Sequence, residues 1–394
     1  MPRTFPVMLA GFGAFLDLYS TQPLLPLLAR TFHASSFAVG LTITAPTLAV
    51  AIAAPWVGRL SDSFGLRKVI VGSAAALAVA TLLAATARDL RELIAWRFAQ
   101  GLATPGLFAS AIAYIHEEWP PSHVGRATAA YVSGTVIGGV IGRLAGGIVA
   151  ADVSWAASFV LLGILSGGVA AGLWAWLPPE KRPNRHPSQE TGLESSIRSH
   201  LRHPQLLATY AVGFCMLCTQ VAMFTYVPFR LAAPPFSLST AQLGLIFLTY
   251  LVGAAVTPFA GRGIDAYGHR VVLVFALALC ASGAVLTLVP SLFIVGSGLA
   301  LFATGVFFAQ ATSSSHVAHH AEQGRGLAIG LYATCYYLGG SVGGALPAVV
   351  WDAGGWPACV AFLLAVELTM LVIAWKVWKP RTGEIANLGL PIAD

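Results

Sequence analysis

The chain has 394 residues, 57% hydrophobic and 10% charged, with a net charge of +6. A soluble globular domain has about 45–50% apolar and about 25% charged residues, so this composition excludes a soluble protein. Twelve membrane spans of roughly 20 residues would use roughly 240 residues, which leaves no room for a large soluble domain.

Apolar stretches follow one another along the chain, each about long enough to cross a bilayer as a helix. They cover residues 5–29, 38–60, 69–87, 92–115, 126–150, 155–177, 205–231, 241–262, 270–289, 291–315, 326–351 and 356–378. The first stretch is too long for a signal peptide, lacks a clear cleavage site and contains Asp17. We therefore predict an all-α integral membrane protein with twelve transmembrane helices.

One long polar stretch, rich in Pro, Ser, His and charge, separates the sixth and seventh spans. It reads as a linker that contains a short amphipathic helix around residues 194–201. The predicted organisation is a six-helix bundle over 1–177, a cytoplasmic linker over 178–204, a second six-helix bundle over 205–378 and a cytoplasmic tail over 379–394.

The placement of Lys and Arg predicts the orientation. With a cytoplasmic N-terminus, only Arg30, Arg88, Arg91 and Arg230 of the 22 basic residues lie outside, and two lie within spans. This excess of positive charge on one side predicts that both termini are cytoplasmic. Because the membrane topology explains the excess of basic over acidic residues, we expect no nucleic-acid partner.

Cysteine and histidine give no sign of a metal, redox or disulfide site. The five cysteines all fall in apolar stretches, and Cys215-x-x-Cys218 lacks a second pair. The cluster of His316, His319 and His320 falls in a predicted cytoplasmic loop, where we expect solvated side chains. We predict no metal and no cofactor.

The two halves are repeats of each other. The segment Gly58-Arg-Leu-Ser-Asp-Ser-Phe-Gly-Leu-Arg follows the second span, and Gly261-Arg-Gly-Ile-Asp-Ala-Tyr-Gly-His-Arg follows the eighth, 203 residues further on. Gly-Arg also opens the fifth and the eleventh spans, at Gly125 and Gly324. Duplicated halves with a substrate path between them are typical of a transporter.

With these motifs the chain resembles the major facilitator superfamily over essentially its whole length. Gly58–Lys68 resembles the family's loop between the second and third helices, and Arg97-Phe-Ala-Gln-Gly resembles an Arg-x-x-x-Gly motif of proton-coupled members. Residues 138–147 are similar to the antiporter motif of the fifth helix, except that Arg143 replaces the proline. Tyr19–Pro26 is similar to the first helix of the twelve-helix drug and sugar efflux branch. The resemblance implies alternating access around a central cavity and leaves the substrate open.

The duplicated loop motif supplies the candidate gating residues, which are Gly58, Asp62, Gly65, Arg67, Asp265 and Arg270. Gly58 and Gly65 permit a tight connection, and Arg67 is expected to anchor the next helix at the lipid headgroups. Asp62 could pair with an arginine or face a helix N-terminus, for roughly 0.3–1 kcal/mol, which suits a latch that must open. The alternative is a loop that only orients the helices.

Asp17, Arg97, Arg143 and Glu367 are ionisable residues inside spans, where charge is expensive. Helix rise places Asp17 at about 18 Å and Arg97 at about 22 Å from the cytoplasmic face, so the two could meet as a proton-coupling ion pair. The alternatives are a snorkelling Arg97 and a static Asp17. Glu367 is also near mid-depth, but the resemblance implies a peripheral last helix.

Glycines recur every fourth residue in the fifth span, at Gly134, Gly138, Gly142 and Gly146. Such a ridge lets another helix approach closely, either for packing alone or to let helices rock at the interface between the halves. Arg143 points about 100° away from this ridge and can face the cavity edge, where it would attract an anionic substrate, or snorkel outward.

Mixed amide and aromatic side chains within the spans suit a small organic molecule better than a bare ion. The substrate-cavity candidates are Gln22, Gln100, Tyr131, Arg143, Gln220, Tyr226, Gln310 and Tyr336, with Thr44, Tyr250 and Tyr332 as further polar positions. Each alone could equally be a helix–helix contact.

The sequence predicts a proton-coupled secondary active transporter that exports a small organic compound such as a drug or sugar. The alternative is proton-coupled uptake of a small organic anion. No nucleotide loop or catalytic triad occurs at membrane depth, and the linker and tails cannot hold a signalling domain, so we expect neither an enzyme nor a receptor. We expect a monomer in the bacterial inner membrane, with a small-molecule substrate, protons and lipid as its partners.

Overall fold

The computed structural model describes residues 4–180, 200, 202–321 and 325–378, and within these ranges the chain forms helices and no strand. Most of the predicted linker, the amphipathic helix expected around 194–201 and the predicted tail lie outside the described residues. The helices of the first repeat are α1 (Phe5–Leu16), η1 (Gln22–Leu24), α2 (Leu25–Thr31), α3 (Ser36–Ala53), η2 (Ala54–Trp56), α4 (Val57–Phe64), α5 (Leu66–Ala84), α6 (Leu90–Glu118), α7 (Pro121–Asp152) and α8 (Trp155–Trp176). Those of the second repeat are α10 (Pro204–Ala232), α11 (Thr240–Leu245), η3 (Ile246–Leu248), α12 (Thr249–Leu286), α13 (Leu292–His320), α14 (Arg325–Ala345) and α15 (Pro347–Val377).

The predicted fold of twelve membrane-crossing helices is confirmed. Nine helices in the described part of the chain are long and apolar enough to cross a membrane, and one of them runs through two predicted spans. The backbone leaves the helical region inside α12 at Gly268, with φ 78°, and inside α15 at Gly354 and Gly355. These positions separate the eighth span from the ninth and the eleventh from the twelfth.

The first span is broken in the middle. Its helix α1 ends at Leu16, turns follow from Asp17 to Thr21, and the short η1 and α2 complete the crossing. Pro23 and Pro26 lie at the first turns of these short helices, where proline is tolerated because the missing N–H has no intrahelical partner there. At the break, the Asp17 carbonyl accepts from the N–H and the hydroxyl of Ser20, whereas the Leu18 carbonyl has no backbone donor among the described residues and must be satisfied by another group.

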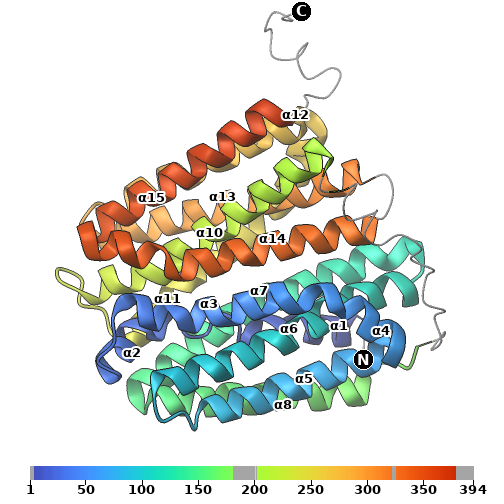
Figure 1. Cartoon of the computed structure of the whole chain (residues 1–394), viewed down its shortest axis with the longest axis horizontal. Helices are drawn as coiled ribbons and strands as arrows, with labels where there is room; N and C mark the ends of the chain where they lie inside the picture. The colour runs from blue at the N-terminus through green and yellow to red at the C-terminus, as the bar shows by residue number, and fades with distance from the viewer. Residues whose placement is uncertain (1–3, 181–199, 201, 322–324, 379–394) are drawn as a thin grey trace, which may run out of the picture. The chain divides into compact units, whose positions relative to one another are not determined.

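The described residues divide into two compact units. The first unit lies within Met1–Glu190, Phe224–Leu248 and Gly344–Val349, and the second within Thr191–Met223, Thr249–Gly343 and Val350–Asp394. In the first unit α5 runs beside both α6 and α8 (Figure 1), while α1 packs on α7. In the second unit α13 packs on α12. The predicted division into two six-helix bundles is based on the sequence repeat, whereas these two units are defined by contacts between residues. The division into bundles therefore stays a prediction.

The glycine ridge of α7 packs on α1, in the same repeat. A Cβ atom at Gly134, Gly138 or Gly142 would overlap the main-chain carbonyl of Met8, Phe12 or Leu16, respectively. The second repeat contains the same arrangement, because a Cβ atom at Gly339 or Gly343 of α14 would overlap the carbonyl of Phe214 or Cys218 in α10. The packing role expected for the ridge is therefore confirmed, and its contacts are with the first helix of its own repeat.

Candidate functional site

The Arg97 side chain fills the break in the first span. Arg97, in α6, is fully buried, and its guanidinium donates to the main-chain carbonyls of Asp17 at 2.8 Å, of Leu18, and of Thr42 at 3.0 Å. It also donates to Oε1 of Gln100 at 2.6 Å, one turn further along α6. The guanidinium thus satisfies the Leu18 carbonyl beyond the end of α1 and the Thr42 carbonyl of α3, and it is a further donor to the Asp17 carbonyl, which also accepts from Ser20.

The Asp17 carboxyl group lies beside this network and has a different partner. The side chain is 1% exposed, and Oδ2 accepts a hydrogen bond from the Ser166 hydroxyl of α8 at 2.6 Å. Oδ1 is buried and has no hydrogen-bond partner among the described residues. A buried carboxyl group with an unused oxygen can gain or lose a proton without the rearrangement that a fully bonded carboxylate would need.

The structure brings Asp17 and Arg97 together, as the depth argument predicted, but through a different contact. The guanidinium binds the main chain of Asp17, and the carboxylate accepts its hydrogen bond from Ser166. The expected side-chain ion pair is replaced by this arrangement because the broken helix offers carbonyl acceptors that a regular helix does not. Gln100 lies on the same face as Arg97, as expected, and its Nε2 donates to Thr81 at 2.7 Å.

Arg143 is the centre of a second polar cluster of the first unit. It is 5% exposed, and it donates to Oε1 of Gln22 at 2.8 Å and to the Gly139 carbonyl at 2.7 Å. Its guanidinium lies over the rings of Tyr19 and Phe247, at 5.1 Å and 4.9 Å from the ring centroids. These contacts hold the side chain inside the protein, so the alternative that Arg143 snorkels to the surface is wrong.

Gln22 joins Arg143 to the second repeat. Its Nε2 donates to the Thr225 hydroxyl of α10 at 3.3 Å. Next to this contact, α11 lies against α7, where a Cβ atom at Gly147 would crowd the carbonyl of Thr240. Residues of both repeats thus pack together within the first unit, around Gln22 and Arg143.

Two more cavity candidates lie in the packed interior of the first unit. The Tyr226 hydroxyl donates to the Gly344 carbonyl at 3.0 Å, and the side chain is fully buried. Tyr131 is 4% exposed and belongs to the hydrophobic core that includes Val7 and Leu107. Both side chains make helix–helix contacts, which is the alternative role that the sequence left open for them.

The remaining candidates, Gln220, Gln310 and Tyr336, belong to the second unit. Nε2 of Gln220 donates to the Tyr250 hydroxyl at 3.3 Å, whereas its Oε1 and that of Gln310 are buried without a hydrogen-bond partner in the described part of the chain. Tyr336 stacks on Tyr332 with 5.9 Å between ring centroids. The two amide oxygens are acceptors that a bound molecule could use.

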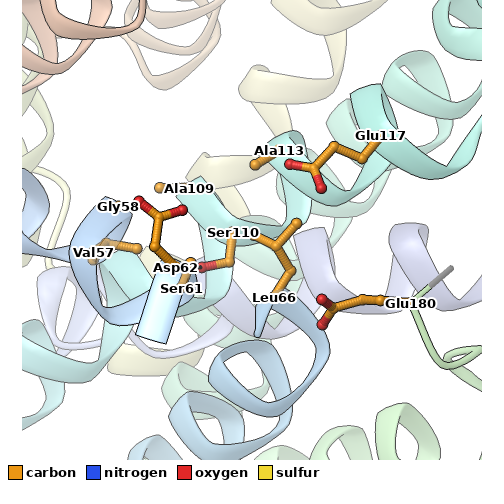
Figure 2. Close-up of a pocket in the computed structure, with 10 residues that line it drawn as sticks. All are labelled: Val57, Gly58, Ser61, Asp62, Leu66, Ala109, Ser110, Ala113, Glu117 and Glu180. Carbon is orange, nitrogen blue, oxygen red and sulfur yellow. Dashed lines mark hydrogen bonds between the residues drawn. The ribbon is translucent and has the colours of Figure 1, made fainter. Parts of the chain in front are cut away.

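The loop motif between α4 and α5 borders a small pocket of about 100 Å³. Figure 2 shows the carboxyl groups of Asp62, Glu117 and Glu180 around it. Ser61 and Ser110 lie within 2.9 Å of each other across its floor and connect α4 with α6. The position of Asp62 at the rim of this pocket leaves its carboxylate available for a neighbouring helix end.

Arg67 and Glu180 cap two helix ends reciprocally. The Arg67 guanidinium donates to the carbonyls of Trp174 and Leu177, both at 2.7 Å, where α8 ends. The Glu180 carboxylate accepts from the main-chain N–H of Arg67, where α5 begins. Arg67 caps α8 because the last carbonyls of that helix have no helical partners and lie within its reach, and its expected place at the lipid headgroups stays a prediction.

One glycine of the motif makes the tight connection. Gly65 joins α4 to α5 with φ 90°, a conformation that favours glycine, and Gly268 has φ 78° at the matching place in α12. Gly58 lies inside α4, and a Cβ atom there would meet open space, so its predicted role in the turn is wrong. In the second copy Asp265 is exposed, and Arg270 lies over the Trp375 ring at 3.6 Å from its centroid.

His316 and His320 are packed within a helix, so the prediction of a solvated loop is wrong for them, whereas His319 is exposed. Helix α13 continues to His320, and His316 is 2% exposed. His316 stacks between His320 and Trp378, with 4.1 Å and 4.0 Å between ring centroids, and its Nδ1 lies 2.8 Å from the Thr209 hydroxyl. No group of His, Cys, Asp or Glu among the described residues is arranged to hold a metal ion.

Sequence patterns do not reveal three residues of these networks. Ser166 and Thr81 are single hydroxyl residues in apolar spans, where such residues are common and usually bond their own helix. Glu180 stands at the start of the polar stretch, among other charges. The one available signal is the position of Ser166, which is ten residues before the end of α8 at Trp176 and so about 15 Å from the predicted cytoplasmic face, close to the depth expected for Asp17.

Comparisons with known proteins agree with this architecture. The family model of the Major Facilitator Superfamily matches residues 7–234 and 231–391. The chain is 32% identical over 372 residues to the MFS-type transporter YybF of Bacillus subtilis (strain 168), covering 94% of this chain and 91% of that protein. It is also 32% identical over 379 residues to the inner membrane transport protein YnfM of Escherichia coli (strain K12), covering 96% and 91% of the two chains.

Solved structures show the same fold. The crystal structure of a mutant of the nucleoside transporter NupG matches with a TM-score of 0.80 at 12% identity, over 96% of this chain and 100% of that chain. A bacterial homologue of the human lysosomal transporter Spinster, inward-facing and unoccupied, matches with a TM-score of 0.74 at 15% identity, over 95% and 94%. At these identities the likeness concerns the fold alone.

Proposed function

This chain belongs to the major facilitator superfamily, and we propose on that premise that it is a proton-coupled secondary transporter that exports a small organic compound by alternating access. It is a multi-pass membrane transporter and not an enzyme. The proposal includes a monomer in the bacterial inner membrane with both termini cytoplasmic, as the distribution of Lys and Arg favours.

The observation that carries proton coupling is the separation of Asp17 from the bonds that hold Arg97. The guanidinium donates its hydrogen bonds to main-chain carbonyls and to Gln100, and these oxygens accept them whatever the charge of the Asp17 carboxyl group. Asp17 can therefore change its protonation state while the fold around Arg97 stays intact. Among the described residues the carboxyl group accepts one hydrogen bond, from Ser166 to Oδ2, and Oδ1 accepts none, so Oδ1 can receive the proton.

Alternating access requires that Asp17 meets water from one side at a time. The hydroxyl of Ser166 belongs to α8 and the carboxyl of Asp17 to the end of α1, so a small shift between these helices would break their hydrogen bond. Breaking it makes the negative charge less favourable, because the carboxylate loses its donor. Movement of the helices and binding of the proton are thereby linked.

The duplicated loop is proposed as the cytoplasmic latch. Asp62 lines the pocket from α4, next to the turn at Gly65 and the reciprocal caps of Arg67 and Glu180. A fixed carboxylate can attract the positive end of a helix for roughly 0.3–1 kcal/mol, which is weak enough to be released in each cycle. The copy with Asp265 and Arg270 would act in the same way in the second repeat.

The export direction rests on the likeness of the fifth span to antiporter members, and transport in proteoliposomes tests it. A thermal-shift screen of small organic compounds first supplies a substrate, because a ligand of the folded state raises its stability. An antiporter accumulates that compound in vesicles with an acidic lumen, since protons leave as substrate enters. Accumulation only from an acidic outside solution would instead show symport, and accumulation insensitive to the pH gradient would contradict proton coupling.

Proton-coupled uptake of a small organic anion is the second candidate, and Arg143 favours it. Its guanidinium is held over Tyr19 and Phe247 and bonded to Gln22, which presents a positive charge in a fixed orientation. Planar guanidinium groups bind carboxylates well. Arg143→Gln should then reduce transport of a carboxylate compound at least tenfold more than transport of its neutral amide. Equal losses for both compounds would leave Arg143 with a structural role and remove this candidate.

A further inference from the structure

Glu367 is a buried carboxyl group of the second unit. The side chain is 4% exposed, and neither Oε1 nor Oε2 has a hydrogen-bond partner among the residues that the structure describes. It is twelve residues beyond the break at Gly355 and eleven before Trp378, which places it about 18 Å and about 16 Å from the two ends of this helix. Glu367 therefore lies near the middle of the membrane-spanning segment.

The helix face that carries Glu367 is apolar and packed. Leu363, Met370, Ala374 and Trp378 follow at helical spacing on this face, and each is at most 2% exposed. The last three join a hydrophobic core with residues of α10, α12 and α13, which are Ala208, Val212, Cys215, Met216, Leu273, Ala276, Leu277 and Ala309, against which Tyr336 of α14 packs. Among the described residues, the titratable side chains of this core are the thiol of Cys215 and the phenol of Tyr336, and the thiol of Cys280 interacts with Glu367; none of the three supplies a positive charge.

The cations of the neighbouring helices lie near helix ends. Arg270 of α12 contacts Trp375, eight positions from Glu367 and so about 12 Å away along α15. The nearest histidine of α13, His316, contacts Trp378, about 16 Å away along the same axis.

Helix α10 brings no closer cation. Its Gln205 side chain donates to the Val377 carbonyl, so the antiparallel α10 passes the level of Glu367 near Cys215. Arg230 is fifteen positions beyond Cys215, about 22 Å further along α10. Lys376, on α15 itself, is nine positions from Glu367 and exposed. An ionised Glu367 would thus be buried without a cation or a donor, which is strongly unfavourable.

The internal repeat shows which residue of the first repeat corresponds to Glu367. Helix α8 begins at Trp155, and the part of α15 beyond its break at Gly355 begins at Trp356. The two helices carry Trp174 and Trp375 near their ends, and both pairs of tryptophans are 201 positions apart. By the same spacing Glu367 corresponds to Ser166, the partner of Asp17. Asp17 itself corresponds to Thr219 of α10, because Phe12 and Leu16 of α1 correspond in their packing to Phe214 and Cys218 of α10, 202 positions further on. The second repeat therefore carries its carboxyl group on the last helix, opposite a neutral hydroxyl group on the first.

We propose that Glu367 is a second proton-binding site, which holds a proton as a neutral carboxylic acid while buried and releases it to water when the packing of α15 on α10 and α12 opens. The step is a simple dissociation, in which the O–H bond of the acid breaks and the proton passes to water. The role of this proton in transport rests on the function proposed above, in which Asp17 is the first site. Each repeat would then contribute one protonatable carboxyl group.

Infrared spectroscopy of the full chain in liposomes tests whether the buried Glu367 is a neutral acid, because a carboxylic acid and a carboxylate absorb at different frequencies. At neutral pH the wild type should show a carboxylic-acid C=O band that is missing in Glu367→Gln and retained in Asp17→Asn. The Gln side chain matches the neutral acid in shape, so this variant should fold with unchanged thermal stability at neutral pH. An identical acid band in wild type and Glu367→Gln would overturn the proposal.

The number of protons released on titration tests whether Glu367 gives up its proton to water. On titration from neutral to alkaline pH, the wild type in liposomes should release one more proton per chain than Glu367→Gln, with parallel loss of the acid band. Equal proton release by both proteins would show that Glu367 never exchanges its proton and would overturn the proposal. The outcome is independent of the function proposed above, since failure of Asp17→Asn to alter pH-driven transport would remove Asp17 as the first site and leave the Glu367 band and proton count unchanged.

Discussion

Arg97 donates to the main-chain carbonyl of Asp17 at 2.8 Å, whereas the Asp17 carboxylate accepts from Ser166 at 2.6 Å. The cation and the carboxyl group are thus held next to each other by separate sets of bonds. This arrangement lets a proton come and go at Asp17 without undoing the contacts that close the break in the first span. Arg97 is a structural anchor for the break as well as the neighbouring positive charge.

Arg97→Ala should lower the free energy of unfolding by about 3–5 kcal/mol, because the buried carbonyls of Leu18 and Thr42 lose the guanidinium donor and that of Asp17 keeps only its bonds from Ser20. Thermal unfolding in detergent measures this loss. The double variant Asp17→Asn/Arg97→Ala should stay within about 1 kcal/mol of the single variant, since the missing donors serve the main chain. Full recovery in the double variant would instead indicate a direct ion pair.

Ser166→Ala removes the hydrogen bond to the Asp17 carboxylate, and hydrogen bonds to charged groups contribute about 1.5–3 kcal/mol. The proton is then held more tightly, so the pH at which transport is half-maximal should rise by about one to two units at about 1.4 kcal/mol per unit. The pH profile of transport in proteoliposomes provides the measurement. Ser158→Ala is the matched control, because Ser158 is a buried serine of the same helix that donates to the Gly146 carbonyl. A profile that moves equally in both variants would argue against a specific effect on Asp17.

Gly138→Ala should destabilise the protein by about 1–3 kcal/mol, because the new Cβ atom would overlap the Phe12 carbonyl and force α7 away from α1. Gly58→Ala should be neutral or stabilising by up to about 1 kcal/mol, since Gly58 is helical and faces open space. Melting temperatures of the two variants in the same detergent check the contrast. Equal melting temperatures would mean that the ridge is not in close contact with α1.

Asp62→Asn should shift the conformational equilibrium toward cytoplasm-open states by about fivefold, which corresponds to a latch of about 1 kcal/mol. Labelling of Ala113→Cys, in the pocket lined by Asp62, with an impermeant maleimide reports the shift on a cysteine-free background. Glu117→Gln changes another carboxyl group of the same pocket and should leave the labelling rate unaltered. Unchanged labelling in Asp62→Asn would exclude the latch.

Hydropathy predicts the spans of this chain well, because roughly 20 consecutive apolar residues have few alternatives to a membrane helix. It does not predict where helices end. The helix that carries His316 continues through polar residues to His320, since hydrogen bonding along the backbone does not stop where hydropathy falls. Apolar content also gave no sign of the break after Leu16, although Pro23 and Pro26 stand close to it.

The sequence predicts which residues form the site, but it does not predict which groups these residues contact. Burial of charge identifies Asp17, Arg97 and Arg143, because charge is rare at membrane depth. The partners of Arg97 are mainly carbonyl groups, which every residue carries, so no pattern of side chains could indicate them. Ser166 could be found only through tertiary structure, as its hydroxyl resembles those of many serines in spans.

Transport by Asp17→Asn in proteoliposomes tests the central claim most directly. With a substrate from the thermal-shift screen, this variant should lose accumulation driven by a pH gradient and keep exchange of labelled for unlabelled substrate, because Asn cannot carry a proton but fits the same site. Asp152→Asn, at the exposed end of α7, is the control and should accumulate substrate like the wild type. Full pH-driven accumulation by Asp17→Asn would contradict the account.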